Sequence, residues 1–168
     1  ELEGYGEYLG NADMPLPEGF EKFKYNGYPC TLPAKFEDIW QMKLNIPDYD
    51  VMNEVFYGGY EEMLDIYDDY TGTYLGMIRV MNPESESLTM MECSVDYFYI
   101  YNPALDDETM DTPNFKFGDG LSFESSYPEV EAYFGTPYYY YTEESKYGNL
   151  YESYDWAYYG EDEIHYVT

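Results

Sequence analysis

The chain has few basic residues, and this scarcity excludes several classes of partner. Only 7 Lys and Arg residues stand against 35 Asp and Glu residues, which gives a formal net charge of −28 over 168 residues. Nucleic-acid binding requires a basic stripe that displaces counterions, whereas the basic residues here are scattered along the chain. An anionic membrane surface repels the same negative charge. We therefore expect no nucleic-acid partner and no membrane insertion of this domain.

The sequence also lacks the residues of the common catalytic sites. Its single histidine is His165, and no Gly-x-Ser-x-Gly turn accompanies it, so we expect no catalytic triad. A lone histidine in a predicted strand is interpreted as a surface or packing residue. The sequence contains no Gly-rich phosphate loop, dinucleotide fingerprint or zinc spacing. We therefore predict a protein that is not an enzyme and has no catalytic residues.

Cysteine and long apolar runs are scarce as well. Cys30 and Cys93 are far apart in the sequence and lack the short paired spacing of a zinc or redox site. One disulfide and two buried free thiols are both compatible with this spacing, because sequence separation does not fix spatial distance. No apolar run approaches the length that spans a bilayer, and the first residues lack the basic and apolar regions of a signal peptide.

Acidic residues gather at two predicted turns, where calcium binding is the alternative to plain solvation. The clusters consist of Asp65, Asp68 and Asp69, and of Asp106, Asp107, Glu108 and Asp111. Oxygen ligands on turns suit a hard cation, but neither cluster keeps the Asp-x-Asp-x-Asp-Gly spacing of a calcium loop. We favour solvated acidic turns that improve solubility. The prediction is therefore no cofactor and no metal ligand, with calcium as the alternative.

Apolar and aromatic residues are abundant in spite of the high charge. They make up 45% and 21% of the chain, and 25 residues are tyrosine, which is enough material for a packed core. Tyrosine combines a large contact area with a polar tip and little rotamer entropy, so binding surfaces favour it. For any single tyrosine, a place in the core is the alternative.

Composition and self-similarity divide the chain into three parts. Residues 1–19 are rich in Gly, Pro and Glu and lack periodicity, which predicts a flexible leader or linker. Phe23-Lys24-Tyr25, followed by Gly27, recurs as Phe115-Lys116-Phe117, followed by Gly118. A predicted short helix follows each copy. We therefore predict a first helix-plus-sheet unit over residues 20–112 and a second over 113–168.

Each predicted unit begins with a helix and continues with strands. Phe36, Ile39 and Trp40 lie close to one face of the first helix. The second helix begins with the capping-box spacing of 126–129 and ends at Gly135. Downstream of each helix the apolar period falls to about two, which predicts strands over 51–57, 60–67, 73–82, 94–101, 138–142, 150–159 and 163–167. Gly58-Gly59 predicts a hairpin and 69–72 a turn. The expected fold class is α+β, with two tandem helix-plus-antiparallel-sheet units that could share one continuous sheet.

Several short segments carry a resemblance to known proteins. The segment 117–137, with its helix, Gly135-x-Pro137 and following strand, resembles an element of β-lactamase-inhibitor-protein-like repeats and of small bacterial envelope lipoproteins. The stretch 23–33, together with 79–82 and 93–95, looks like secreted or lipid-anchored proteins of Gram-positive bacteria with no assigned activity. The resemblance covers roughly residues 20–168. It implies tandem units whose concave sheet face grips a partner protein, and an extracellular or cell-surface location. The paired cysteines of each inhibitor repeat are absent here.

Aromatic residues lie on both faces of the predicted strands. Over 94–101, alternation places Val95 with three tyrosines on one face and Phe98 with Ile100 on the other. Aromatic residues on both faces of a sheet imply either helices on both sides or an open aromatic platform. With two predicted helices we favour the platform. The predicted partner-binding residues are Tyr97, Tyr99, Tyr101, Tyr139 and Tyr141.

These observations favour a binding role over catalysis. The leading hypothesis is a non-enzymatic extracellular or cell-envelope module that binds a protein or peptide carrying basic groups, with tyrosines as anchors and acidic charge steering the encounter. A carbohydrate or cell-wall binding domain is the first alternative, because exposed rings can stack on sugar faces. An envelope-structural domain that spaces or packs against others is the second.

Overall fold

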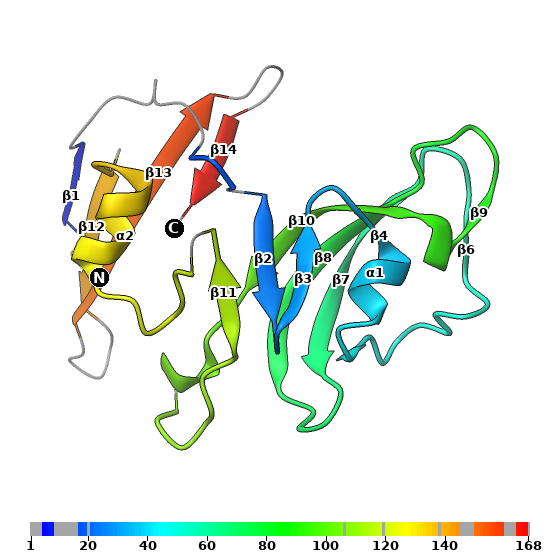
Figure 1. The fold of residues 1–168 in the computed structure, drawn as a ribbon, viewed down its shortest axis with the longest axis horizontal. Coiled ribbons are helices and arrows are strands. Elements are labelled where there is room, and N and C mark those ends of the chain that lie inside the picture. The colour runs from blue at the N-terminus through cyan, green and yellow to red at the C-terminus, as the bar shows by residue number, and fades with distance from the viewer. Residues whose placement is uncertain are drawn as a thin grey trace. The chain divides into compact units, whose positions relative to one another are not determined.

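The computed structural model describes residues 5–8, 17–19, 21–105, 107–118, 120–137, 139–144, 150–159 and 164–167 (Figure 1). The chain forms two compact units. The larger unit comprises Glu21–Phe123, and the smaller unit combines Glu1–Phe20 with Glu124–Thr168. Of the predicted leader over residues 1–19, the described parts are 5–8 and 17–19.

The predicted α+β fold class is wrong, because the chain is mostly β. Among the described residues, strands far outnumber helical elements, and the fold includes a curled half-barrel sheet. The described residues contain two α-helices, α1 (Phe36–Trp40) and α2 (Tyr127–Phe134), of 5 and 8 residues. The predicted helices therefore exist, but each is too short to form a layer of its own.

The larger unit contains three antiparallel sheets. The five-stranded sheet has the order β4 (Ala34–Lys35), β10 (Ser94–Ile100), β8 (Tyr74–Met81), β7 (Glu61–Asp68) and β5 (Leu44–Asn45). The three-stranded sheet has the order β11 (Phe115–Phe117), β2 (Lys22–Tyr25) and β3 (Tyr28–Thr31). The third sheet pairs β6 (Val55–Phe56) with β9 (Leu88–Thr89). The 3-10 turns Met90–Glu92 and Pro103–Leu105 flank β10.

The repeated Phe-Lys-aromatic segments both lie in the larger unit. They are neighbouring strands, β2 and β11, and they pair with each other in register, Lys24 opposite Lys116. The apolar–Lys–apolar alternation is what a strand with one buried face requires, so it recurs wherever such strands occur. The rings of Tyr25 and Phe115, which are opposite each other, stack with their centroids 4.6 Å apart. The similarity thus reflects a shared position in one sheet.

The three-stranded sheet packs against one face of the five-stranded sheet, as Figure 1 shows. Phe98 on β10 contacts Phe23 on β2 and Phe115 on β11, with ring centroids 4.8 and 6.1 Å apart. Phe36 and Ile39 bury the inner side of α1 in the same core. Burial of each such side chain contributes about 1.5–3 kcal/mol. One face of the five-stranded sheet is therefore sealed by the unit's own elements.

The predicted hairpin at Gly58-Gly59 is wrong. β6 pairs with β9, residues 51–53 form a turn, and β7 pairs with β8 instead. The glycine loop docks on the segment after β8, where the Gly59 N–H donates to the carbonyls of Asn82 and Glu84, both at 3.1 Å. The buried amide of Asn82 donates to the carbonyl of Phe56 at 2.8 Å and so holds β6 in this place. The predicted turn over 69–72 is confirmed between β7 and β8.

Asp68, at the end of β7, ties this turn to the neighbouring sheet. One of its carboxylate oxygens accepts a hydrogen bond from the Tyr25 hydroxyl on β2. The other accepts the backbone N–H groups of Tyr70 at 3.0 Å and Thr71 at 2.7 Å. Burial of Asp68 opposes its ionisation, but the hydrogen bonds from Tyr25, Thr71 and Tyr70 outweigh it and lower the pKa of the carboxyl.

Replacing Asp68 with asparagine is expected to destabilise the protein in a pH-dependent way. Because the pKa of Asp68 is lower in the folded state, its contribution is present above the unfolded-state value of about 3.9 and is lost as pH falls through the folded-state value. At neutral pH, Asp68→Asn should lower the free energy of unfolding by about 1–3 kcal/mol. Urea unfolding at neutral pH and near pH 3 measures this difference. Asp69→Asn, an exposed neighbour, is the matched control, and an equal loss from Asp68→Asn at both pH values would contradict the account.

The smaller unit is a four-stranded antiparallel sheet with α2. Its strand order is β1 (Tyr5–Tyr8), β12 (Tyr139–Glu144), β13 (Leu150–Tyr159) and β14 (Ile164–Val167), which confirms the last three predicted strands. The capping interaction of α2 is confirmed, because the Ser126 N–H and hydroxyl donate to the Glu129 carboxylate at 2.8 and 2.7 Å. Gly135 ends the helix with φ of 81°.

Candidate functional site

A β-bulge in β10 decides which of its side chains face outward. Its register with β8 shifts between Val95 and Tyr97, so Asp96 is an extra residue. Val95 is therefore buried on the same side as Phe98, whereas Tyr97 and Tyr99 are 44% and 43% exposed on the opposite side. Strict alternation predicts Val95 on the side of the tyrosines, and this prediction is wrong because alternation takes no account of a bulge. The bulge therefore separates the two exposed tyrosines from buried Val95, which lies on the core side of the strand.

Three rows of side chains cross the outward side of β7, β8 and β10. Strand register places Arg79 of β8 opposite both Met63 of β7 and Tyr97 of β10, and places Met77 opposite both Asp65 and Tyr99. A third row follows where the strands end. We define the tyrosine face by these nine residues: Met63, Asp65, Tyr67, Tyr74, Met77, Arg79, Tyr97, Tyr99 and Tyr101. The side chains between them in β7 and β8, such as Leu64 and Ile78, are buried on the core side.

The third row is an aromatic cluster. The ring centroids of Tyr67 and Tyr74 are 5.5 Å apart in an edge-on arrangement, and those of Tyr74 and Tyr101 are 6.0 Å apart. Burial raises the pKa of the Tyr74 hydroxyl, and Asp65, Tyr99 and Tyr67 raise it further. Of these neighbours, Asp65 is the carboxylate. This end of the tyrosine face therefore presents aromatic surface beside one negative charge.

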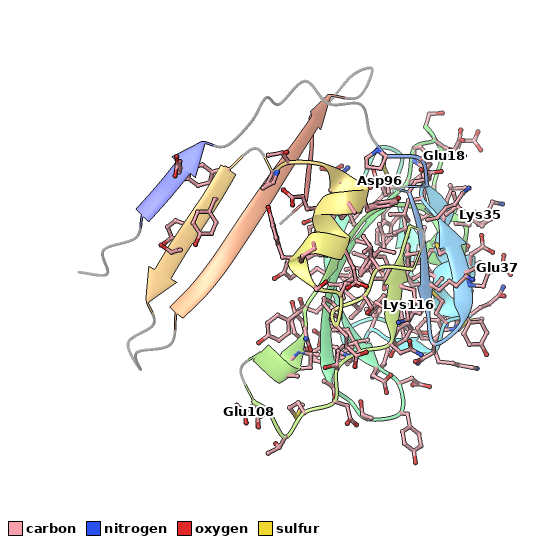
Figure 2. The ribbon with its side chains drawn as sticks, turned by 60° about the vertical axis from the view of Figure 1, so that its left-hand side comes forward. Glu18, Lys35, Glu37, Asp96, Glu108 and Lys116 are labelled. Atoms are coloured by element: carbon pink, nitrogen blue, oxygen red, sulfur yellow. The ribbon has the colours of Figure 1, made fainter. Side chains whose placement is uncertain are left out.

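Arg79 is the basic member of the tyrosine face, and its charge is balanced. Its Nε donates to one carboxylate oxygen of Asp96 and a terminal nitrogen to the other, each at 2.8 Å. Asp96 is the bulge residue, so the bulge also supplies the partner of the arginine. This bidentate geometry fixes the guanidinium plane beside Tyr97. Figure 2 labels Asp96, together with Lys35 and Glu37 of the same unit.

The five predicted binding tyrosines are divided between the two units. Tyr97, Tyr99 and Tyr101 belong to the tyrosine face of the larger unit, as predicted for a shared face. Tyr139 and Tyr141 lie on β12 of the smaller unit, where both are half-buried. A side chain at Gly6 of β1 would overlap the Tyr139 hydroxyl, so this ring lies over its neighbouring strand.

Sequence reasoning missed the members of the tyrosine face that come from β7 and β8. Met63, Asp65, Met77 and Arg79 are outward residues in strands that were predicted correctly. The available signal was the alternation of Met63, Asp65 and Tyr67 with buried Leu64 and Ile66, which predicts one face for the first three. The missing information was the order of the strands.

A separate hollow of about 610 Å3 lies between β3, β4 and α1, with Cys30, Lys35 and Asp38 among its lining residues. Burial, followed by the nearby charge of Asp38, raises the pKa of the Cys30 thiol to about 11. The thiolate is the reactive form of cysteine, so this thiol is a poor nucleophile near neutral pH. Cys30 and Cys93 are both buried free thiols.

The acidic clusters considered for calcium make local hydrogen bonds. The Asp107 carboxylate accepts hydrogen bonds from the N–H and hydroxyl of Thr109 at 2.9 and 2.7 Å. The Asp68 carboxylate accepts hydrogen bonds from Tyr25, Tyr70 and Thr71. Asp106 lies outside the described residues. Within the described part of the chain, no group of three or more His, Cys, Asp or Glu side chains could hold a metal ion. The side chain of His165, on β14, is also outside the described residues.

Two further observations bear on the class of protein. None of the helices in the described ranges is long and apolar enough to cross a membrane. Comparisons with protein-family models, with curated proteins and with solved structures found no match.

Proposed function

We propose that the larger unit binds a protein or peptide carrying basic groups through its tyrosine face, without catalysing a reaction. The observation that carries the proposal is the exposure of Tyr97 and Tyr99 on β10 and of Met63 on β7, each 43–44% exposed, on the two strands that flank β8 in one sheet. Rigid aromatic and methionine side chains are favoured at binding surfaces, because they bury large areas at low entropic cost. The extracellular or cell-surface location is supported by the sequence resemblance alone.

The charge of the molecule favours a basic partner. The net charge is −28, and β7 contributes two exposed carboxylates here, Asp65 within the tyrosine face and Glu61 on the same strand. The one arginine on this face is paired with Asp96, so its charge does not oppose an incoming cation. Complementary charge raises the rate of encounter and selects against acidic partners. Aromatic contact and electrostatic attraction therefore act together at this surface.

Titration with short blocked peptides tests the proposal. A peptide of alternating lysine and alanine should bind, whereas the matched glutamate and alanine peptide should not. The dissociation constant should rise several-fold between about 50 and about 300 mM salt, because screening weakens attraction between exposed charges. Isothermal calorimetry measures both constants. The carbohydrate alternative predicts a different result. A cell-wall oligosaccharide would then bind equally at both salt concentrations, and the lysine peptide would not bind.

A further inference from the structure

We propose that Asp65, Tyr67, Tyr74 and Tyr99 form a receptor for one alkylammonium group, occupied by a lysine side chain of the partner. The inference rests on the proposed function and names the chemical group that the tyrosine face selects. It concerns one end of the face, where the row Asp65–Met77–Tyr99 lies next to the aromatic row.

The geometry brings rings and a carboxylate together from three strands. Tyr74 lies between Tyr67 and Tyr101, with ring centroids 5.5 and 6.0 Å away. Asp65 precedes Tyr67 by two residues on β7, so both point to the same side of the sheet. Asp65 is exposed and Tyr99 is 43% exposed. A ligand can therefore reach the carboxylate and the rings from solvent.

The chemistry of this cluster suits a cation with an apolar stem. A cation within about 6 Å of a tyrosine ring centroid is attracted by the ring quadrupole, and the Asp65 carboxylate adds an ion pair. Among the neighbours that raise the pKa of Tyr74 after burial, Asp65 is a carboxylate and the other two are tyrosines, a residue type that is neutral near pH 7. An ammonium group would therefore meet one negative charge beside the rings. The methylene stem of lysine can meanwhile lie along Met77 and the rings.

Other ligand classes fit this cluster less well. An anion would be repelled by the charge of Asp65. The charge of Arg79, the basic residue of this face, is already balanced by Asp96. A calcium ion takes six to eight oxygen ligands, and no cluster of three potential ligand residues exists among the described side chains. The combination of aromatic rings with one carboxylate therefore selects a monovalent organic cation.

Small probes test the receptor without a peptide. Choline, its neutral isostere 3,3-dimethyl-1-butanol and N-acetyl-lysine methylamide are each titrated into the full chain, and the tyrosine ring signals are followed by NMR. Choline and the lysine amide should shift the ring signals of Tyr74 and Tyr99, and the isostere should not. Tighter binding of the lysine amide supports a protein lysine as the occupant. Tighter binding of choline overturns that occupant in favour of a quaternary ammonium molecule, and equal binding of choline and its isostere overturns the receptor itself.

Matched variants separate the receptor from general attraction. Asp65→Asn and Asp48→Asn remove the same charge, but Asp48 is exposed in the loop after β5 and outside the tyrosine face. Asp65→Asn should weaken binding of the lysine amide about threefold or more, with no change for Asp48→Asn. Tyr74→Phe should keep binding because it keeps the ring, whereas Tyr74→Leu should lose it. Equal effects of the two aspartate substitutions would overturn the receptor.

The outcome also separates this inference from the proposed function. If the lysine peptide binds and requires Tyr97 and Tyr99 but no ammonium probe binds, the receptor is wrong and the proposed function stands. If the ammonium probes bind as described but the peptide does not, the receptor stands and the proposed function is wrong.

Discussion

Replacing both Tyr97 and Tyr99 with alanine is expected to weaken binding of the lysine-alanine peptide by about tenfold or more, since each anchor aromatic contributes on the order of 2 kcal/mol. Both rings are more than two-fifths exposed, so their removal takes little area out of the core. The midpoint of thermal unfolding should therefore change little. Calorimetric titration and a thermal unfolding scan of the same variant measure the two effects.

The test is specific for the aromatic rings because the two substitutions do not alter the charge of the chain. A molecule with a net charge of −28 attracts any lysine-rich peptide to some extent, but the two substitutions leave this charge unchanged. The matched control is the double variant Tyr57→Ala and Tyr70→Ala, because these tyrosines are 74% and 98% exposed in turns outside the tyrosine face. An equal loss of binding in test and control would show that the face has no special role. Unfolding of the test variant would show that its rings belong to the core.

Gly76→Ala is expected to produce the largest loss of stability, roughly 3 kcal/mol or more in the free energy of unfolding. Gly76 lies in β8 between β7 and β10 and has φ of 136°, a conformation that other residues rarely adopt. An added Cβ would overlap the Tyr99 carbonyl oxygen and lie 3.2 Å from the Cα of Ile100. The clash is with backbone, so β10 must move away from β8 at Tyr99.

The control for Gly76 is Gly72→Ala in the turn of the same hairpin. Gly72 also has positive φ, 69°, but an added Cβ there meets nothing within 4 Å. Its cost should therefore be the conformational strain alone, about 1 kcal/mol. Urea unfolding of both variants separates the clash from the strain. Similar losses at the two positions would contradict the close approach of β8 and β10 at Gly76.

Local features of the fold were predictable from the sequence. The capping spacing at Ser126 and Glu129, the turn over 69–72 and the strands β7, β8 and β10 depend on residues that are close in sequence. Such features follow from side-chain hydrogen bonds, turn chemistry and alternation. Three of the five predicted site tyrosines, those on or just after β10, lie on the tyrosine face for the same reason.

The errors arose where contacts are distant in sequence. Pairing of β2 with β11 brings Tyr25 beside Phe115, and no local pattern predicts this contact between segments far apart in the sequence. The Gly58-Gly59 sequence is typical of a hairpin turn. In the structure, however, the buried amide of Asn82 holds β6 where it pairs with β9 instead. The bulge at Asp96 was missed because it depends on the register with β8. Strand order and register are thus the information that composition and periodicity do not contain.

The most direct test of the proposed binding surface is the titration with the lysine-alanine peptide, followed residue by residue in an NMR spectrum of isotopically labelled protein. The account predicts that signals of Met63, Met77, Tyr97 and Tyr99 shift with the peptide concentration, while those of Tyr57 and Tyr70 do not. Shifts confined to acidic loops such as 48–54, with no change on the tyrosine face, would contradict it.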